Sequence, residues 1–126
     1  MTHQDAPFDD AMLRSAEREL AVALGSDDPT AWVDHYTEDA VFDAGGEHGV
    51  EGRQALLEMA RSMRPLSEVS IRPLRTLGSG DLAAVWTDAS WISGEPSDRR
   101  NVHVRGILVW RRDGDGRWRV AMEHIS

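Results

Sequence analysis

The 126-residue sequence contains no cysteine and no lysine, and it has no long apolar run. Without cysteine, disulfide bonds and thiolate metal sites are excluded. No segment approaches the roughly 20 apolar residues that cross a bilayer, and the first ten residues do not resemble a signal peptide, so we expect a cytoplasmic location. The formal net charge of −8 disfavours nucleic acid and anionic membranes as partners.

The first half of the chain carries helix signals. Apolar positions fall on one stripe between Asp9 and Leu24, and Pro65 ends a second periodic segment, Arg53–Arg64. Between them, Asp28 is placed as an N-cap before Pro29. A helix that starts there and continues would bring Trp32, His35 and Tyr36 onto one face. Residues 1–8 are predicted to be a flexible arm.

The second half has the pattern of strands joined by glycine-rich turns. A short strand is predicted at Ala40–Phe42, and four more at Val69–Leu77, Leu82–Ile92, Val102–Arg112 and Trp118–Ile125. Helices followed by strands indicate an α+β fold, a single domain over residues 1–126 with the helices on one face of a curved, mostly antiparallel sheet.

Three segments carry a family resemblance: HYTEDAVFDAGG with VEGRQAL, then GDLAAVW, and finally LVWRRDGDGRWRVAMEHIS. They resemble the nuclear-transport-factor-2-like superfamily, and within it the SnoaL-like and ketosteroid-isomerase-like small bacterial proteins. The resemblance implies a cone-shaped half-barrel with an internal pocket, often as a homodimer. It does not imply one reaction, because this fold hosts isomerases, polyketide cyclases, dehydratases, epoxide hydrolases and binding modules.

The direction of the strand side chains decides which residues reach such a pocket. On the last strand, hydrophobicity favours Trp118, Val120, Met122 and His124 inside, whereas the resemblance favours Arg119, Ala121, Glu123 and Ile125. We follow the resemblance. The same phase predicts that the following side chains also point inward: Trp86, Asp88 and Ser90, then Val104, Gly106 and Leu108, then Phe42 and Ala44.

Steroid isomerisation is disfavoured by three replacements. The resemblance aligns the isomerases' proton-shuttling Asp with Ala44, their oxyanion Tyr with Leu20 and their protonated Asp with Leu108. None of these side chains transfers a proton or donates to an oxyanion.

Two carboxylates remain as catalytic candidates. Asp88 and Glu123 resemble, in position, the acids of limonene-epoxide-hydrolase-like proteins, although Trp86 and Ala44 replace that family's Arg and Asn. In an apolar pocket their pKa values would separate, which suits an acid and a base. We predict substrate-binding walls formed by Trp32, Tyr36, Phe42, Trp86 and Leu108. The alternative is that both carboxylates are ordinary surface groups.

An inverted strand phase would give a different site. His103, Arg105 and His124 would then line the pocket, with His124 as base and Arg105 as anion clamp. His48, in the glycine-rich loop, is a further rim candidate. We expect no metal and no cofactor, because no histidines and carboxylates have metal-ligand spacing along a helix.

Two functions of different kinds follow. The first is a cofactor-free enzyme for acid/base chemistry on a hydrophobic, oxygenated small molecule, of the cyclase, hydrolase, dehydratase or isomerase class. The second is a dimeric module that binds a ligand or a partner without catalysis. For either, we predict a homodimer through the convex sheet face bearing Trp118, Val120 and Met122, with Trp110 or Trp91 at its margin.

Overall fold

The computed structural model describes residues 7–44, 49–63 and 65–126. Within these ranges it has three helices, α1 (Asp10–Leu24), α2 (Pro29–Val33) and α3 (Arg53–Ser62). The Asp9 carboxylate accepts a hydrogen bond from Met12 N at 3.1 Å, and that of Asp28 accepts one from Thr30 N at 3.0 Å. These side chains satisfy N–H groups that a helix start leaves unpaired. No helix in these ranges is long and apolar enough to cross a membrane.

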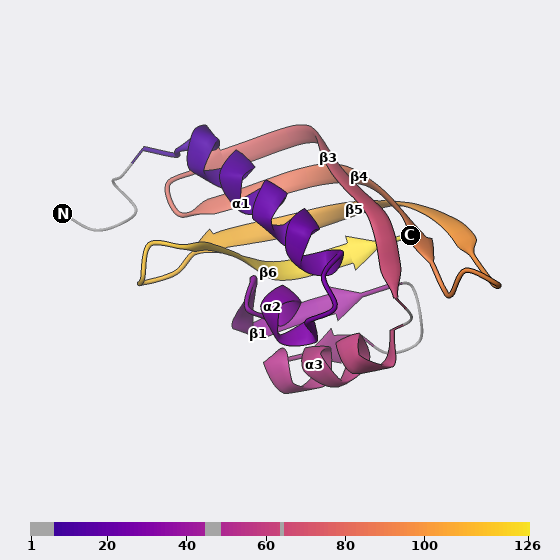
Figure 1. Ribbon diagram of the computed structural model, residues 1–126. Coiled ribbons are helices and arrows are strands. Elements are labelled where there is room, and N and C mark those ends of the chain that lie inside the picture. The colour runs from indigo at the N-terminus through magenta and orange to yellow at the C-terminus, as the bar shows by residue number, and fades with distance from the viewer. Residues whose placement is uncertain (1–6, 45–48, 64) are drawn as a thin grey trace.

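Six strands form one sheet. They are β1 (Tyr36–Asp43), β2 (Val50–Glu51), β3 (Leu66–Ser79), β4 (Leu82–Ser93), β5 (Arg100–Arg112) and β6 (Trp118–Ile125). The order across the sheet is β2-β1-β6-β5-β4-β3, and every neighbouring pair is antiparallel except β1 and β6 (Figure 1). The predicted α+β architecture is therefore confirmed, with β2 as a strand that the sequence did not predict.

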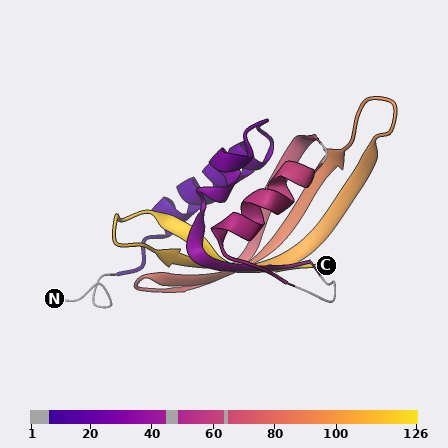
Figure 2. The same ribbon diagram turned by 90° about the horizontal axis from the view of Figure 1, so that it is seen from below.

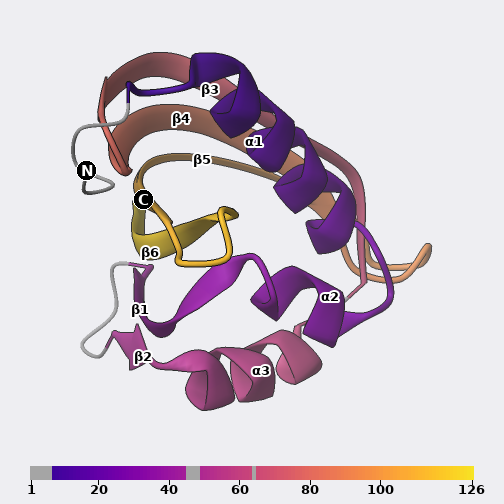
Figure 3. The same cartoon turned by 90° about the vertical axis from the view of Figure 1, so that its left-hand side faces the viewer.

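The helices cover one side of the sheet only. Figure 2 shows α1 and α3 on the same side. Figure 3 shows the sheet curling, with β3 and β4 at one end and β1 and β2 at the other. The core fills the concave side, where Leu13, Leu20, Leu56 and Val85 are almost completely buried. The opposite face of the sheet carries no helix among the described residues.

Two predictions at the ends of helices need correction. Helix α2 stops at Val33, and Tyr36 begins β1 by pairing with Val120, so Trp32, His35 and Tyr36 do not share a helix face. The rings of Trp32 and Tyr36 still meet edge to face, with centroids 5.0 Å apart. Of the predicted arm, residues 1–6 lie outside the described ranges, while Phe8 packs on Trp118 at a centroid distance of 5.8 Å. Arg64, the predicted last residue of the third helix, also lies outside them.

Strand β6 changes phase part-way along its length. Trp110 pairs with Val120 and Val109 with Met122, so Ala121 is an extra residue in the ladder. Such a bulge reverses which side chains face the core. Trp118 and Val120 are buried before it (3% and 0% exposed), whereas Glu123 lines the interior after it. Before the bulge, the side chains that face the core are those that hydrophobicity favoured. After it, they are those that the resemblance favoured.

This burial corrects the predicted dimer surface. Trp118, Val120 and Trp110 belong to the monomer core and Trp91 lines an internal cavity, so none of them offers a convex patch. Only Met122 of that set is exposed on the outer face.

Candidate active site

A cavity of about 220 Å³ lies between the concave face of the sheet and the helices. A cavity of about 150 Å³ holds benzene, so this one has room for a somewhat larger molecule. Its lining is almost wholly apolar, and among the described residues only Tyr36, Thr87 and Glu123 bring a hydroxyl or carboxyl group to it. The full lining is Leu20, Leu24, Trp32, Tyr36, Phe42, Met59, Met63, Leu66, Ile71, Thr87, Ala89, Trp91, Val104, Gly106, Leu108, Glu123 and Ile125.

Small residues keep the floor of the cavity open. Thr87 on β4 pairs with Gly106 on β5, and Ala89 follows on the same inward row. A Cβ atom on Gly106 would stand 2.8 Å from the carbonyl oxygen of His124 and from Ile125 Cγ2. That distance is below ordinary van der Waals contact, so the close approach of β6 to β5 beside the cavity requires glycine.

Glu123 is the ionisable centre of the cavity. Its side chain is partly buried and faces the cavity, and the Tyr36 hydroxyl donates a hydrogen bond to Glu123 Oε1 at 2.5 Å. Burial raises the pKa of Glu123 to about 7, and the hydrogen bond from Tyr36 acts in the opposite direction. Burial also raises the pKa of Tyr36 well above its ordinary value, so this hydroxyl stays a neutral donor. Glu123 is therefore divided between acid and carboxylate near neutral pH.

The structure brings together several of the predicted site residues. Trp32, Tyr36, Phe42 and Leu108 surround the cavity that Glu123 enters, and Trp32 also meets Phe42 edge to face. Their parts in binding or catalysis stay predictions.

The predicted inward orientation of Asp88 and Trp86 is wrong. In β4 the inward residues are Val85, Thr87 and Ala89, because they pair with Leu108, Gly106 and Val104 on the inward row of β5. Asp88, Trp86 and Ser90 consequently point to the outer face. The Trp86 side chain is 48% exposed there.

On the outer face, Asp88 lies among three basic side chains. His103 Nε2 lies 2.6 Å from Asp88 Oδ1, Arg72 Nη2 lies 3.4 Å from Oδ2, and Arg105 Nε lies 3.5 Å from Oδ1. The hydrogen bond with His103 is the main cause that holds the pKa of Asp88 below its ordinary value. Asp88 and Glu123 do not share a site.

The site expected from an inverted phase is not formed either. His103 and Arg105 belong to the Asp88 cluster, and His124 Nδ1 lies 3.1 Å from Asp43 Oδ2 on the exposed side. Ala44 is exposed and does not line the cavity. His48 lies outside the described residues. Across the described ranges, no three His, Asp or Glu side chains gather as a metal-binding group.

Sequence reasoning missed the β4 contribution of Thr87, Ala89 and Trp91. The signal was present, because Ala83, Val85, Ala89 and Trp91 form an apolar row at alternate positions. The opposite row contains Asp88 and Ser90. The family resemblance favoured the opposite phase, so this pattern was not followed.

A second hollow adjoins the cavity at the turn between α1 and α2. It shares Leu24, Trp32, Met63 and Leu66 with the cavity, and its lining also includes Asp27, Asp28 and Arg61. The apolar cavity therefore has a more polar neighbour.

Fold and site together define a small α+β protein with an apolar pocket that one carboxyl group, that of Glu123, faces. The model of the SnoaL-like domain matches residues 16–121, and the chain belongs to this family. No curated protein is a detectable relative by sequence.

Solved structures share the fold at low sequence identity. A ketosteroid isomerase-like protein from Erwinia carotovora atroseptica is 19% identical with a TM-score of 0.78, covering 94% of this chain and 97% of its own. A candidate aromatic ring hydroxylase from Novosphingobium aromaticivorans is 21% identical with a TM-score of 0.78, covering 92% and 86%. A candidate scytalone dehydratase from the same organism is 15% identical with a TM-score of 0.78, covering 91% and 80%. These likenesses establish the nuclear-transport-factor-2-like fold and leave the reaction open.

Proposed function

We propose that this protein is a cofactor-free enzyme that uses Glu123 as a general acid and base on a small, hydrophobic, oxygenated molecule. The observation that carries the proposal is the Glu123 side chain in the wall of an apolar cavity, hydrogen-bonded to Tyr36 and with a pKa of about 7. A catalytic acid or base works best when its pKa lies near the working pH. Burial of a carboxyl group without a cation costs stability, which is typical of functional sites.

A single carboxyl group favours proton transfer over hydrolysis by two acids. The carboxylate of Glu123 removes a proton from a carbon beside a carbonyl group and returns it to another atom of the same molecule. This cycle serves isomerisation, and its first half serves dehydration or cyclisation. Epoxide hydrolysis by an acid and a base needs a second carboxyl group in the cavity. Asp88 does not provide it, because it pairs with His103 outside the cavity.

The hydrogen bond from Tyr36 to Glu123 also contributes to this proton transfer. It occupies Oε1 of Glu123, and the described residues offer no hydrogen bond to Oε2, which is therefore the oxygen that exchanges the proton. When Glu123 becomes protonated and neutral, it is a weaker acceptor of the Tyr36 hydrogen bond. The hydroxyl can then turn to a substrate oxygen on which negative charge has developed.

Proton transfer can be measured without the natural substrate. The probe is 2-indanone, a small apolar ketone with acidic C–H groups, incubated with the protein in D₂O while ¹H NMR follows exchange of those hydrogens. Wild-type protein should accelerate exchange, and Glu123→Gln should lose about 10²-fold or more of that acceleration. Asp88→Asn is the matched control and should exchange like wild type.

The competing function is a module that binds a ligand without catalysis. If tryptophan fluorescence shows 2-indanone bound while Glu123→Gln and wild type exchange at the same rate, the binding module is favoured and the catalytic proposal fails.

A homodimer through the outer sheet face remains part of the proposal. We define the outer patch as Trp86, Ile107 and Met122, which are 48%, 53% and 52% exposed. Trp86 pairs directly with Ile107, and Met122 follows on the next strand. Side chains of both charge signs, among them Asp88 and Arg105, border this patch, so a second copy of the same face is a complementary partner. The cytoplasmic location expected from the sequence stays a prediction.

A further inference from the structure

Strand β1 leaves its partner strand immediately after Tyr36. Tyr36 pairs with Val120 and Val41 with Met122, so five residue steps on β1 correspond to two on β6. The backbone groups between these pairs need other hydrogen-bond partners, because unpaired polar groups are costly when buried. Thr37 and Ala40, within this irregular stretch, are fully buried.

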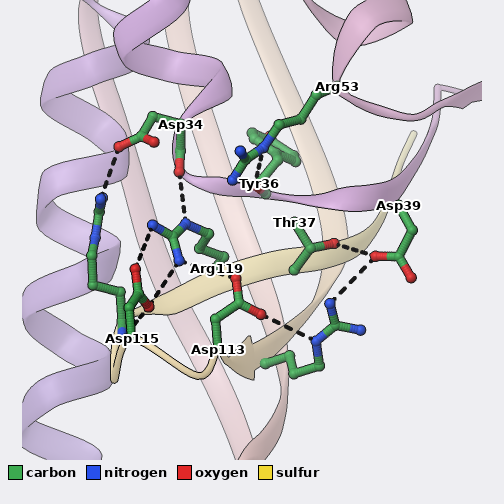
Figure 4. A network of polar contacts seen from close by, with 10 residues as sticks. Asp34, Tyr36, Thr37, Asp39, Arg53, Asp113, Asp115 and Arg119 are labelled. Atoms are coloured by element: carbon green, nitrogen blue, oxygen red, sulfur yellow. Dashed lines mark hydrogen bonds and ion pairs between the residues drawn. The ribbon is translucent and has the colours of Figure 1, made fainter.

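Three consecutive carbonyl oxygens at this point have three different donors, and Figure 4 shows the contacts of two of them, Asp34 with Arg119 and Tyr36 with Arg53. Arg119 Nε donates to the oxygen of Asp34 at 3.1 Å, and Val120 N donates to that of His35 at 2.8 Å. Arg53 donates twice to the carbonyl oxygen of Tyr36, from Nε at 2.9 Å and from Nη2 at 2.7 Å. Two arginine side chains and one main-chain N–H thus hold the backbone that leads into β1, and at the Tyr36 carbonyl the donor is Arg53.

Arg53 lies outside the candidate active site. It is the first residue of α3 and follows Gly52, whose φ of 87° is a left-handed conformation that suits glycine. The N–H of Gly52 donates to the carbonyl oxygen of Ala40 at 2.8 Å. The hydrogen bonds of Gly52 and Arg53 therefore connect both ends of the irregular stretch of β1 to the start of α3.

We propose that Arg53 is a positioning residue that fixes the backbone of Tyr36 and thereby holds the Tyr36 hydroxyl on Glu123. The inference rests on the proposed function only in taking Glu123 as the working group. The 2.5 Å hydrogen bond between Tyr36 and Glu123 tolerates little displacement of the strand. Arg53 reaches Tyr36 from outside the cavity, because it does not belong to the cavity lining.

The protonation of Glu123 reports this positioning directly. Tyr36 is the other titratable residue of the lining, and its hydrogen bond favours the charged form of Glu123. If loss of Arg53 loosens the Tyr36 backbone, that hydrogen bond weakens and the pKa of Glu123 rises.

The experiment is a ¹³C NMR titration of protein labelled at the glutamate carboxyl carbons, with the Glu123 resonance assigned from Glu123→Gln. Arg53→Gln should raise the pKa of Glu123 by about one unit, as expected for a weakened hydrogen bond to a charged group. Arg53→Lys, which keeps one donor and the charge, should restore part of the shift. Arg111→Gln is the matched control, because Arg111 lines the same surface hollow as Arg53 but pairs with Asp39 and Asp113.

The Tyr36→Phe background separates positioning from simple charge. There the hydroxyl is absent, so Arg53→Gln should leave the pKa of Glu123 unchanged. An equal shift in both backgrounds, or no shift in either, overturns the proposal even if Arg53→Gln lowers the melting temperature. If Arg53→Gln does not fold, Arg53→Lys in the two backgrounds gives the same comparison. Neither result depends on turnover, so the catalytic role of Glu123 is tested separately by exchange of 2-indanone.

Discussion

Glu123 and Asp88 are carboxylates on opposite faces of the same sheet, and their surroundings give them opposite properties. Glu123 faces an apolar cavity with a neutral hydroxyl as its partner, and its pKa is raised to about 7. Asp88 faces outward between His103, Arg72 and Arg105, and its pKa is lowered. Basic neighbours favour the charged form of a carboxyl group, whereas an apolar cavity without them favours the neutral form and lets the group exchange a proton near neutral pH.

The largest expected effect is the dependence of stability on pH that Glu123 causes. Its folded-state pKa of about 7 lies above the ordinary 4.5, so its contribution is complete below pH 4.5 and is lost as pH rises through 7. A shift of this size corresponds to about 3 kcal/mol. Glu123→Gln should therefore gain about that much relative to wild type between pH 4.5 and pH 8, as measured by urea unfolding.

In the same experiment, Asp88→Asn should show no gain as pH rises. A parallel pH profile for wild type and Glu123→Gln would contradict the raised pKa.

Tyr36→Phe tests the neutral partner inside the cavity. At pH 8 it removes a hydrogen bond to a charged carboxylate and should cost about 2 kcal/mol of unfolding free energy. At pH 5 the carboxyl group is neutral and the cost should be smaller. Because this change keeps the ring on Trp32, equal losses at both pH values would show that the hydrogen bond does not distinguish the charged form.

The outer patch gives a third test, through association. Trp86→Ser should raise the dimer dissociation constant at least about tenfold, because large aromatic residues dominate interface energies. Sedimentation equilibrium measures this, and binding of 2-indanone in the cavity is the control that should not change. Val22→Ser removes an exposed apolar side chain on α1 and should leave association unaffected. A wild-type protein that is monomeric at micromolar concentration contradicts the dimer.

The smallest effect is expected for Asp88→Asn. The lowered pKa of Asp88 means that its contribution is present above about pH 3.8 and is lost as pH falls through the folded-state value. The variant should therefore be slightly less stable than wild type at neutral pH, and the difference should disappear in acid. High salt should reduce the difference, since the cluster is close to solvent.

The sequence predicted the fold well because its signals are local. Asp28 is an N-cap as the helix pattern predicted, and the turn at residues 113–116 joins the last two strands. Which side chains of a strand face the core is harder to predict, because it depends on how that strand pairs with its neighbours in the sheet. A bulge at Ala121 reverses β6, and no single-strand pattern reveals it.

The candidate site was predicted in part for the same reason. Glu123 and Tyr36 both reach the cavity, but Tyr36 does so from a strand rather than from a helix. Their hydrogen bond joins positions 87 residues apart. Asp88 was placed inside by a resemblance, whereas the alternation of β4 places it outside.

The most direct test of the account is one ¹³C titration that follows both carboxyl groups in the wild-type protein, with the resonances assigned from Glu123→Gln and Asp88→Asn. The account predicts that Glu123 titrates at about 7 and that Asp88 titrates below 3.8. If Glu123 instead titrates near 4.5, it is not the acid/base group described here, and the proposed proton transfer loses its basis.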